Sequence, residues 1–129
     1  MNRKPLLFLK DILSAIERIE SYTRNGKSEF LNSSSLQDAT LFRLQTIGEA
    51  VNQLPNELKE KYPEIPWRQI TGLRNLLAHV YWQVDITTVW TILEPEGDLA
   101  ALKLVVIKLI DDFPLSKQRS PKAYFWFIK

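Results

Sequence analysis

The amino-acid sequence predicts an all-α fold, an up-and-down bundle of four or five helices, and three observations support this prediction. Apolar residues recur at helical spacing in several segments, no segment alternates apolar and polar residues as a strand would, and the connections between periodic segments are short. The chain has 129 residues, the usual size of one domain. We therefore expect one helical domain over residues 1–113 and a tail of different character over residues 114–129.

The first helix is predicted over residues 5–23, because apolar residues recur three or four positions apart with charged residues between them. The residues of this stripe are Leu9, Ile12, Ile16 and Ile19. The run TRNGKSEFLNSSS that follows is rich in turn-forming residues and predicts a loop. Ser35, with Asp38 three residues later, resembles a capping box that opens a second helix ending near Leu54. Its stripe is Leu41, Leu44, Ile47, Val51 and Leu54.

Prolines divide the middle of the chain. Pro55 and Pro63 limit the segment NELKEKY to a short helix. Pro66 suits the first turn of a third main helix, which we expect to end near His79. The residues of this helix that we expect to point inward are Trp67, Ile70, Leu73 and Leu77.

The last third of the chain predicts two more periodic segments. Asp85 is the expected N-cap of a fourth helix, and Pro95 with Gly97 kinks or breaks the chain before the helical period resumes. The apolar stripe of the first segment is Ile86, Val89, Trp90 and Leu93. The stripe of the second segment is Leu99, Leu102, Val106, Leu109 and Phe113.

Composition narrows the classes of function. The chain has no cysteine and one histidine, so disulfides and thiolate metal sites are excluded, and we expect neither a metal site nor a cofactor. The apolar run Leu6 to Leu9 is followed by Lys10 and Asp11, and it is too short for a signal peptide or a membrane span. We therefore expect a cytoplasmic protein with no membrane partner.

Charge is distributed unevenly along the chain. The net charge is +2, but residues 114–129 contain four basic residues and no acid, so the first 113 residues carry 13 basic and 15 acidic residues. An overall basic field therefore does not indicate nucleic-acid binding, and any such function requires a local site. The aromatic residues near the end of the tail are able to stack on RNA bases, although packing on its own domain or on a partner subunit is the commoner role.

The stretch R-N-L-L-A-H-V-Y-W, residues 74–82, contains the only histidine of the chain. Arg74 supplies a permanent charge on a planar fork suited to a phosphate, and His79 transfers protons near neutral pH. RNA transesterification requires a group that removes the proton of the 2′-hydroxyl or donates a proton to the leaving oxygen. It also requires a group that stabilises the extra charge on phosphorus. This pair meets both demands. The alternative is that His79 only caps its helix or satisfies a hydrogen bond.

Helical geometry constrains how the two side chains cooperate. Five residues along a helix separate Arg74 from His79 by ~140° of azimuth and ~7.5 Å of rise, so the two do not share a face. Asn75 and His79, at positions i and i+4, do share one. Arg74 and His79 converge on one phosphate only if the helix ends near His79 or if a second copy of the chain supplies one of them. A two-fold homodimer meets this requirement and places two histidines in one cleft.

Several motifs together resemble one known family. R-N-L-L-A-H is an R-x-x-x-x-H motif, which becomes R-x-x-x-x-H-x-Y with Tyr81, and it follows L-Q-T-I-G-E-A-V-N and Y-P-E-I-P-W-R-Q-I-T-G-L. Over about residues 5–112 the chain resembles the HepT-like ribonuclease toxins, which contain a HEPN domain and pair with MntA-like nucleotidyltransferase antitoxins. The resemblance implies a HEPN bundle that forms a homodimer or a higher oligomer, and a metal-independent endoribonuclease that cleaves cellular RNA. It does not extend to the tail.

The resemblance also implies roles for individual residues. Arg74 and His79 match the catalytic positions, and Asn75 matches a supporting polar residue. Tyr81 matches the tyrosine to which the antitoxin, a minimal nucleotidyltransferase, transfers AMP, which would silence the nuclease. Arg68 is a further candidate for RNA binding, and an ordinary surface charge is its alternative.

Two other functions remain open at this point. One is a non-catalytic helical subunit that binds a nucleotide or a nucleotidyltransferase and uses the arginine and histidine as an anion site. The other is a structural dimerisation bundle. Among the remaining residues, we expect Asp38 to cap its helix and Glu49 to be solvated or to pair between helices, and the alternative for both is a hydrogen bond into the cleft. Trp67, Trp82 and Trp90 are expected to pack in the core or at a dimer contact.

Overall fold

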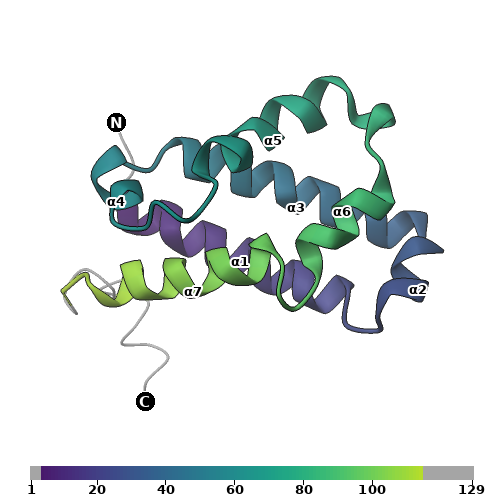
Figure 1. The fold of residues 1–129 in the computed structure, drawn as a ribbon, viewed down its shortest axis with the longest axis horizontal. Helices are drawn as coiled ribbons and strands as arrows, with labels where there is room; N and C mark the ends of the chain where they lie inside the picture. Colours follow the sequence, from purple (N-terminus) through teal and green to yellow (C-terminus); the bar gives the residue numbers. More distant parts are fainter. Residues whose placement is uncertain (1–3, 115–129) are drawn as a thin grey trace, which may run out of the picture.

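The computed structural model describes residues 4–114, and it confirms the all-α prediction for that part of the chain, in which no strand occurs. Figure 1 shows the helices in chain order. They are α1 (Pro5–Tyr22), α2 (Lys27–Leu31), α3 (Ser34–Asn52), α4 (Asn56–Glu60), α5 (Trp67–His79), the short 3-10 helix η1 (Tyr81–Gln83), α6 (Ile86–Leu93) and α7 (Asp98–Asp111). The tail that we predict from residue 114 onward lies, beyond Pro114, outside the described residues.

The core forms where the predicted apolar stripes meet. α3 packs against both α1 and α5, and α1 also packs against α7. In the view of Figure 1, α5 and α7 accordingly lie on opposite sides of the α1 and α3 pair. Each stripe residue predicted for the first two helices is buried, and so are Leu99, Leu102, Val106 and Leu109 of α7. Burial of these amphipathic faces supplies the main drive for the fold.

The segment predicted to be a loop after α1 contains a helix, α2, and that prediction was wrong. The Phe30 side chain is fully buried and its ring lies 5.3 Å from the ring of Trp90, centroid to centroid. Gly26 precedes the helix with a φ of 97°, a backbone conformation that favours glycine. A five-residue helix is too short to be stable by itself. The burial of Phe30 against α6 therefore holds this turn in place.

The N-cap of α6 is the residue predicted from the sequence, whereas the N-cap of α3 is a different one. Asp85 caps α6 as predicted, because its carboxylate accepts a hydrogen bond from the backbone N–H of Thr87 at 3.0 Å. α3 begins at Ser34, one residue earlier than the proposed cap at Ser35, and Ser33 accepts the hydrogen bond from Leu36 N–H at 3.2 Å. The capping serine was therefore predicted two residues too late.

None of the helices that residues 4–114 form is both long enough and apolar enough to cross a membrane.

Candidate functional site

Helix α5 carries most of the predicted site and presents two different faces. Ile70 and Leu77 are buried against the core. Arg68, Asn75 and His79 are exposed, and their spacing of seven and four residues places them on one outward face. The helix thus separates the residues that fold it from those that are available for chemistry.

Arg74 points toward α3 instead. Its Nη1 lies 3.3 Å and 3.4 Å from the two carboxylate oxygens of Glu49, and the two side chains are 33% and 57% exposed. The Nε of Arg74 is buried and has no hydrogen-bond partner among the described residues. Glu49 therefore fixes the direction of the guanidinium, and the exposed third of the side chain remains open to a ligand.

A glycine makes this pairing possible. A Cβ at Gly48 would lie 2.8 Å from the carbonyl oxygen of Ile70 and 3.0 Å from the backbone nitrogen of Arg74. Only a residue without a side chain allows α5 to approach α3 so closely, and this approach brings Glu49 beside Arg74. The importance of Gly48 was not predicted from the sequence, although a glycine inside an amphipathic helix was the available signal.

His79 is the last residue of α5, as predicted, and its side chain is exposed. Within residues 4–114 its imidazole forms no hydrogen bond with a helix carbonyl, so the side chain does not cap α5 there. No hydrogen bond joins His79 to Arg74 in the described part of the chain. The structure therefore places the two candidate catalytic residues on different faces of α5, as their five-residue spacing requires.

Tyr81 lies in η1, immediately after α5, and is 42% exposed. Its hydroxyl donates a hydrogen bond to Oδ1 of Asp38 on α3. This hydrogen bond raises the pKa of Tyr81 above its ordinary value, because a phenolate beside the Asp38 carboxylate would lose the bond and repel the charge. Asp38 is thus a partner of Tyr81 and does not cap α3, so its expected role was wrong. It is the fifth residue of the helix, too far from the free N–H groups to cap them.

The three tryptophans within residues 4–114 differ in their packing. Trp90 is buried against Phe30, and Trp67 is partly buried and donates from its indole N–H to the carbonyl of Tyr62 at 2.9 Å. Trp82 is 75% exposed, so it does not pack in the core of the chain. Trp82 was expected to pack either in the core or at a dimer contact, and the dimer contact stays a prediction.

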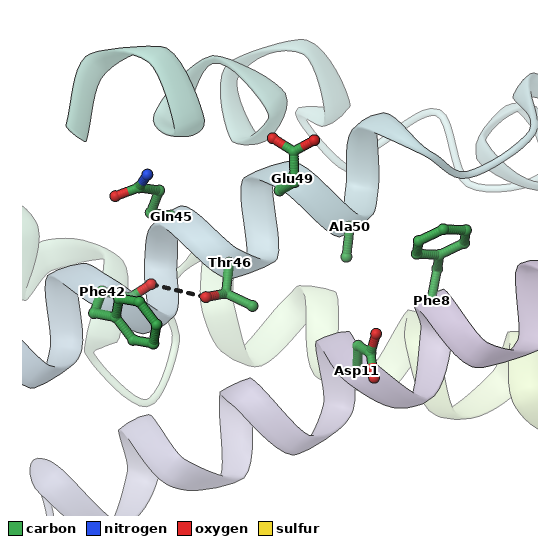
Figure 2. A pocket seen from close by; sticks show the side chains of 7 residues that line it. All are labelled: Phe8, Asp11, Phe42, Gln45, Thr46, Glu49 and Ala50. Atoms are coloured by element: carbon green, nitrogen blue, oxygen red, sulfur yellow. Dashed lines mark hydrogen bonds between the residues drawn. The ribbon is translucent and has the colours of Figure 1, made fainter. Parts of the chain in front are cut away.

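A pocket of about 340 Å³ lies between α1 and α3, next to the Arg74 and Glu49 pair. Figure 2 shows Phe8 and Asp11 projecting from α1, and α3 supplying the remaining lining residues. These are Phe42, Gln45, Thr46, Glu49 and Ala50. Glu49 therefore belongs both to the pocket and to the ion pair with Arg74. Among the described residues, no group of three or more His, Cys, Asp or Glu side chains is arranged to hold a metal ion.

Comparison with known proteins gives a consistent family signal. The family model described as HepT-like, "Ribonuclease HepT-like", matches residues 12–109. A Thermococcus cleftensis protein named "Probable ribonuclease HepT" is 39% identical over 104 residues, which cover 80% of this chain and 93% of the relative. A Methanocaldococcus jannaschii protein named "Putative RNase" is 42% identical over 84 residues, which cover 64% of this chain and 69% of the relative.

A second protein of Methanocaldococcus jannaschii is longer than this chain. It is named "Gamma-glutamylcyclotransferase and putative RNase", and it is 35% identical over 125 residues, which cover 96% of this chain and 55% of the relative. The chain thus spans about half the length of that protein. No solved structure matches the chain significantly.

Proposed function

This chain belongs to the HepT-like family of HEPN ribonucleases, and we propose that it is a metal-independent endoribonuclease in which Arg74 and His79 cleave cellular RNA. The observation that carries the proposal is the placement of Arg74. Its guanidinium is held by Glu49 at the seam between α3 and α5 and is still partly exposed. An arginine oriented in this way is prepared to bind a phosphate of the RNA backbone.

The reaction would be a transesterification within the RNA. The 2′-oxygen forms a bond with the adjacent phosphorus, the bond from phosphorus to the 5′-oxygen breaks, and a 2′,3′-cyclic phosphate and a 5′-hydroxyl result. One imidazole accepts the proton of the 2′-hydroxyl, and an imidazolium donates a proton to the leaving 5′-oxygen. The Arg74 guanidinium stabilises the charge that develops on the phosphoryl oxygens. Asn75, one turn before His79, is proposed to orient the imidazole or the phosphate.

A homodimer completes this site. Within one chain Arg74 faces α3 and His79 faces outward, so the two cannot both serve one phosphate. The outward side of α5 and the turn after it expose Leu76, which is 44% accessible, and Trp82. A second copy that covers these side chains would bring the His79 side chains of both copies into one cleft and so supply both proton-transfer groups.

The test is cleavage of purified total RNA in the presence of EDTA. We expect discrete products with the wild type and none with Arg74→Ala or His79→Ala, while both variants keep the helicity and the mass of the wild-type assembly. Leu104→Ala, a change at a residue that is 62% exposed and lies on α7, away from this site, is the control and should cleave normally. Arg68→Ala should weaken RNA binding if Arg68 contacts a phosphate. RNA retention without cleavage by the wild type would instead support the non-catalytic binding subunit.

We further propose that the chain is the toxin of a toxin–antitoxin pair and that its partner transfers AMP to Tyr81. The Tyr81 side chain is partly exposed, and the residue lies two positions after His79. AMP on the hydroxyl oxygen of Tyr81 would remove the hydrogen bond to Asp38 and place a phosphodiester anion beside that carboxylate. Tyr81→Phe should keep nuclease activity and accept no AMP from the partner nucleotidyltransferase. Persistent AMP transfer to that variant would refute the role of Tyr81.

A further inference from the structure

Phe42 is an exposed aromatic residue in the middle of the proposed site. Its side chain is 59% exposed. On α3 it lies one turn after Asp38 and two turns before Glu49, and a spacing of four and seven residues places all three on one face of the helix. Asp38 binds Tyr81 and Glu49 binds Arg74. Phe42 therefore occupies the surface between the candidate phosphate-binding residue and the candidate modified tyrosine.

Positive charge gathers beside this ring. The guanidinium carbon of Arg43 lies 5.3 Å from the centroid of the Phe42 ring. Hydrogen bonding and charge from Arg43, with a smaller contribution from Arg18 on α1, hold the pKa of Tyr22 below its ordinary value. The Nε of Arg43 is buried and has no hydrogen-bond partner among the described residues. Neither arginine forms an ion pair with a described carboxylate, so neither charge is neutralised in this part of the chain.

We propose that Phe42, Arg43 and Arg18 form a subsite for an unpaired nucleotide of the RNA, with the base stacked on the Phe42 ring and a neighbouring phosphate held by the two arginines. Aromatic faces and guanidinium planes are the groups on which proteins stack single-stranded bases. This inference rests on the proposed ribonuclease function, and it adds the substrate class, because a base inside a duplex cannot stack on a protein ring.

A nucleic acid suits this surface better than a second copy of the chain does. A two-fold contact centred on Phe42 would bring four arginines together, two from each copy, none of which forms an ion pair with a described carboxylate of its own chain. An RNA strand carries the complementary charge and releases counterions on binding. Stacking also reads no particular base. The subsite therefore selects unpaired RNA and tolerates changes in its sequence.

The experiment measures binding of a fluorescent single-stranded RNA oligonucleotide and of its duplex to the full chain carrying His79→Ala, which prevents turnover. Adding Phe42→Ala should raise the Kd for the single strand roughly five- to a hundredfold, the range found for loss of one stacked base. Phe42→Trp should bind at least as well as the parent. Arg43→Gln should weaken binding and reduce the salt dependence by about one counterion. The control is Leu104→Ala, because Leu104 is also exposed, at 62%, but lies on α7.

Several results would overturn the subsite. Unchanged affinity in Phe42→Ala, equal affinity for the single strand and the duplex, or equal losses in Phe42→Ala and Leu104→Ala would each do so. A loss of dimer mass in Phe42→Ala would identify the ring as a protein contact and would also refute the proposal. The proposed function fails separately: if the wild type binds the strand through Phe42 but never cleaves RNA, the nuclease is refuted and the subsite stands.

Discussion

Replacing Gly48 with alanine tests whether the close approach of α3 and α5 positions the candidate site. The added Cβ would lie 2.8 Å from the backbone oxygen of Ile70 and 3.0 Å from the backbone nitrogen of Arg74, whereas ordinary contact begins near 3.4 Å. The two helices must therefore separate locally by about 0.6 Å, because the clashing atoms belong to the backbone and cannot rotate away. This movement acts directly on the residue that binds Glu49.

Two opposing contributions determine how Gly48→Ala changes the free energy of unfolding. Overpacking a core contact costs about 1–3 kcal/mol, and replacing glycine by alanine inside a helix returns about 0.5–1 kcal/mol. Gly72 on α5 provides the matched control, because a Cβ there would have no atom within 4 Å. Gly72→Ala should show only the stabilisation that comes from replacing glycine by alanine inside a helix. The two variants should therefore differ in their free energy of unfolding by about 1–3 kcal/mol, which is the cost of the clash itself.

The assay is chemical denaturation of both variants at several protein concentrations, combined with RNA cleavage. Gly48→Ala should be the less stable of the two and should cleave RNA more slowly, because Arg74 moves relative to Glu49. Measurement at several concentrations is needed because Gly72 lies on the proposed dimer face, where a new methyl group would produce a concentration-dependent loss. Equal stability of the two variants in the concentration-independent transition would refute the close helix contact as the determinant of the site.

Three further predictions concern individual contacts. Glu49→Ala should lower kcat/KM for RNA more than Glu49→Gln, which keeps one acceptor oxygen for Arg74, and neither should change stability by more than about 1 kcal/mol because the ion pair is exposed. Wild-type activity in Glu49→Ala would contradict this. Asp38→Asn should lower the raised pKa of Tyr81 toward its ordinary value, as followed by NMR of the phenol carbon. Because the folded pKa of Tyr81 is raised, the stability that its hydrogen bond provides is present below pH 10 and is lost as the pH rises through that pKa. Asp85→Ala should cost about 1 kcal/mol through loss of the α6 cap, and an unchanged denaturation midpoint would exclude that role.

The positions of the main helices were predictable because each amphipathic helix carries the pattern of its own buried face. The four predicted stripe residues of α1 are all 1% exposed or less. α2 was not predictable in this way, since it depends on the burial of Phe30 against an element about sixty residues away in the chain. Local sequence correctly indicated the N-cap at Asp85 and placed the start of α5 one residue early, at Pro66. It indicated the wrong serine as the cap of α3, where several serines are adjacent.

The components of the candidate site were visible in the sequence, but their partners were not. Arg74 and Tyr81 were identified from the R-x-x-x-x-H-x-Y pattern, and both remain candidates for the roles predicted. Glu49 and Asp38 are 25 and 43 residues away from them along the chain. No local rule connects residues at such separations, because the connection is set by how α3 and α5 cross, and Gly48 determines how closely they do so.

Glu49 and Asp38, the two acidic residues of α3, bind opposite ends of the R-x-x-x-x-H-x-Y motif. This arrangement determines how AMP on Tyr81 would affect the motif. Glu49 binds Arg74 in the middle of α5, next to the Gly48 contact, whereas Asp38 binds Tyr81 just beyond the end of that helix. AMP on Tyr81 would break only the second link, and the new anion would repel Asp38. We infer that the end of α5 that carries His79 would then move away from α3, while Arg74 stays in place. Modification would accordingly remove proton transfer more completely than it removes phosphate binding.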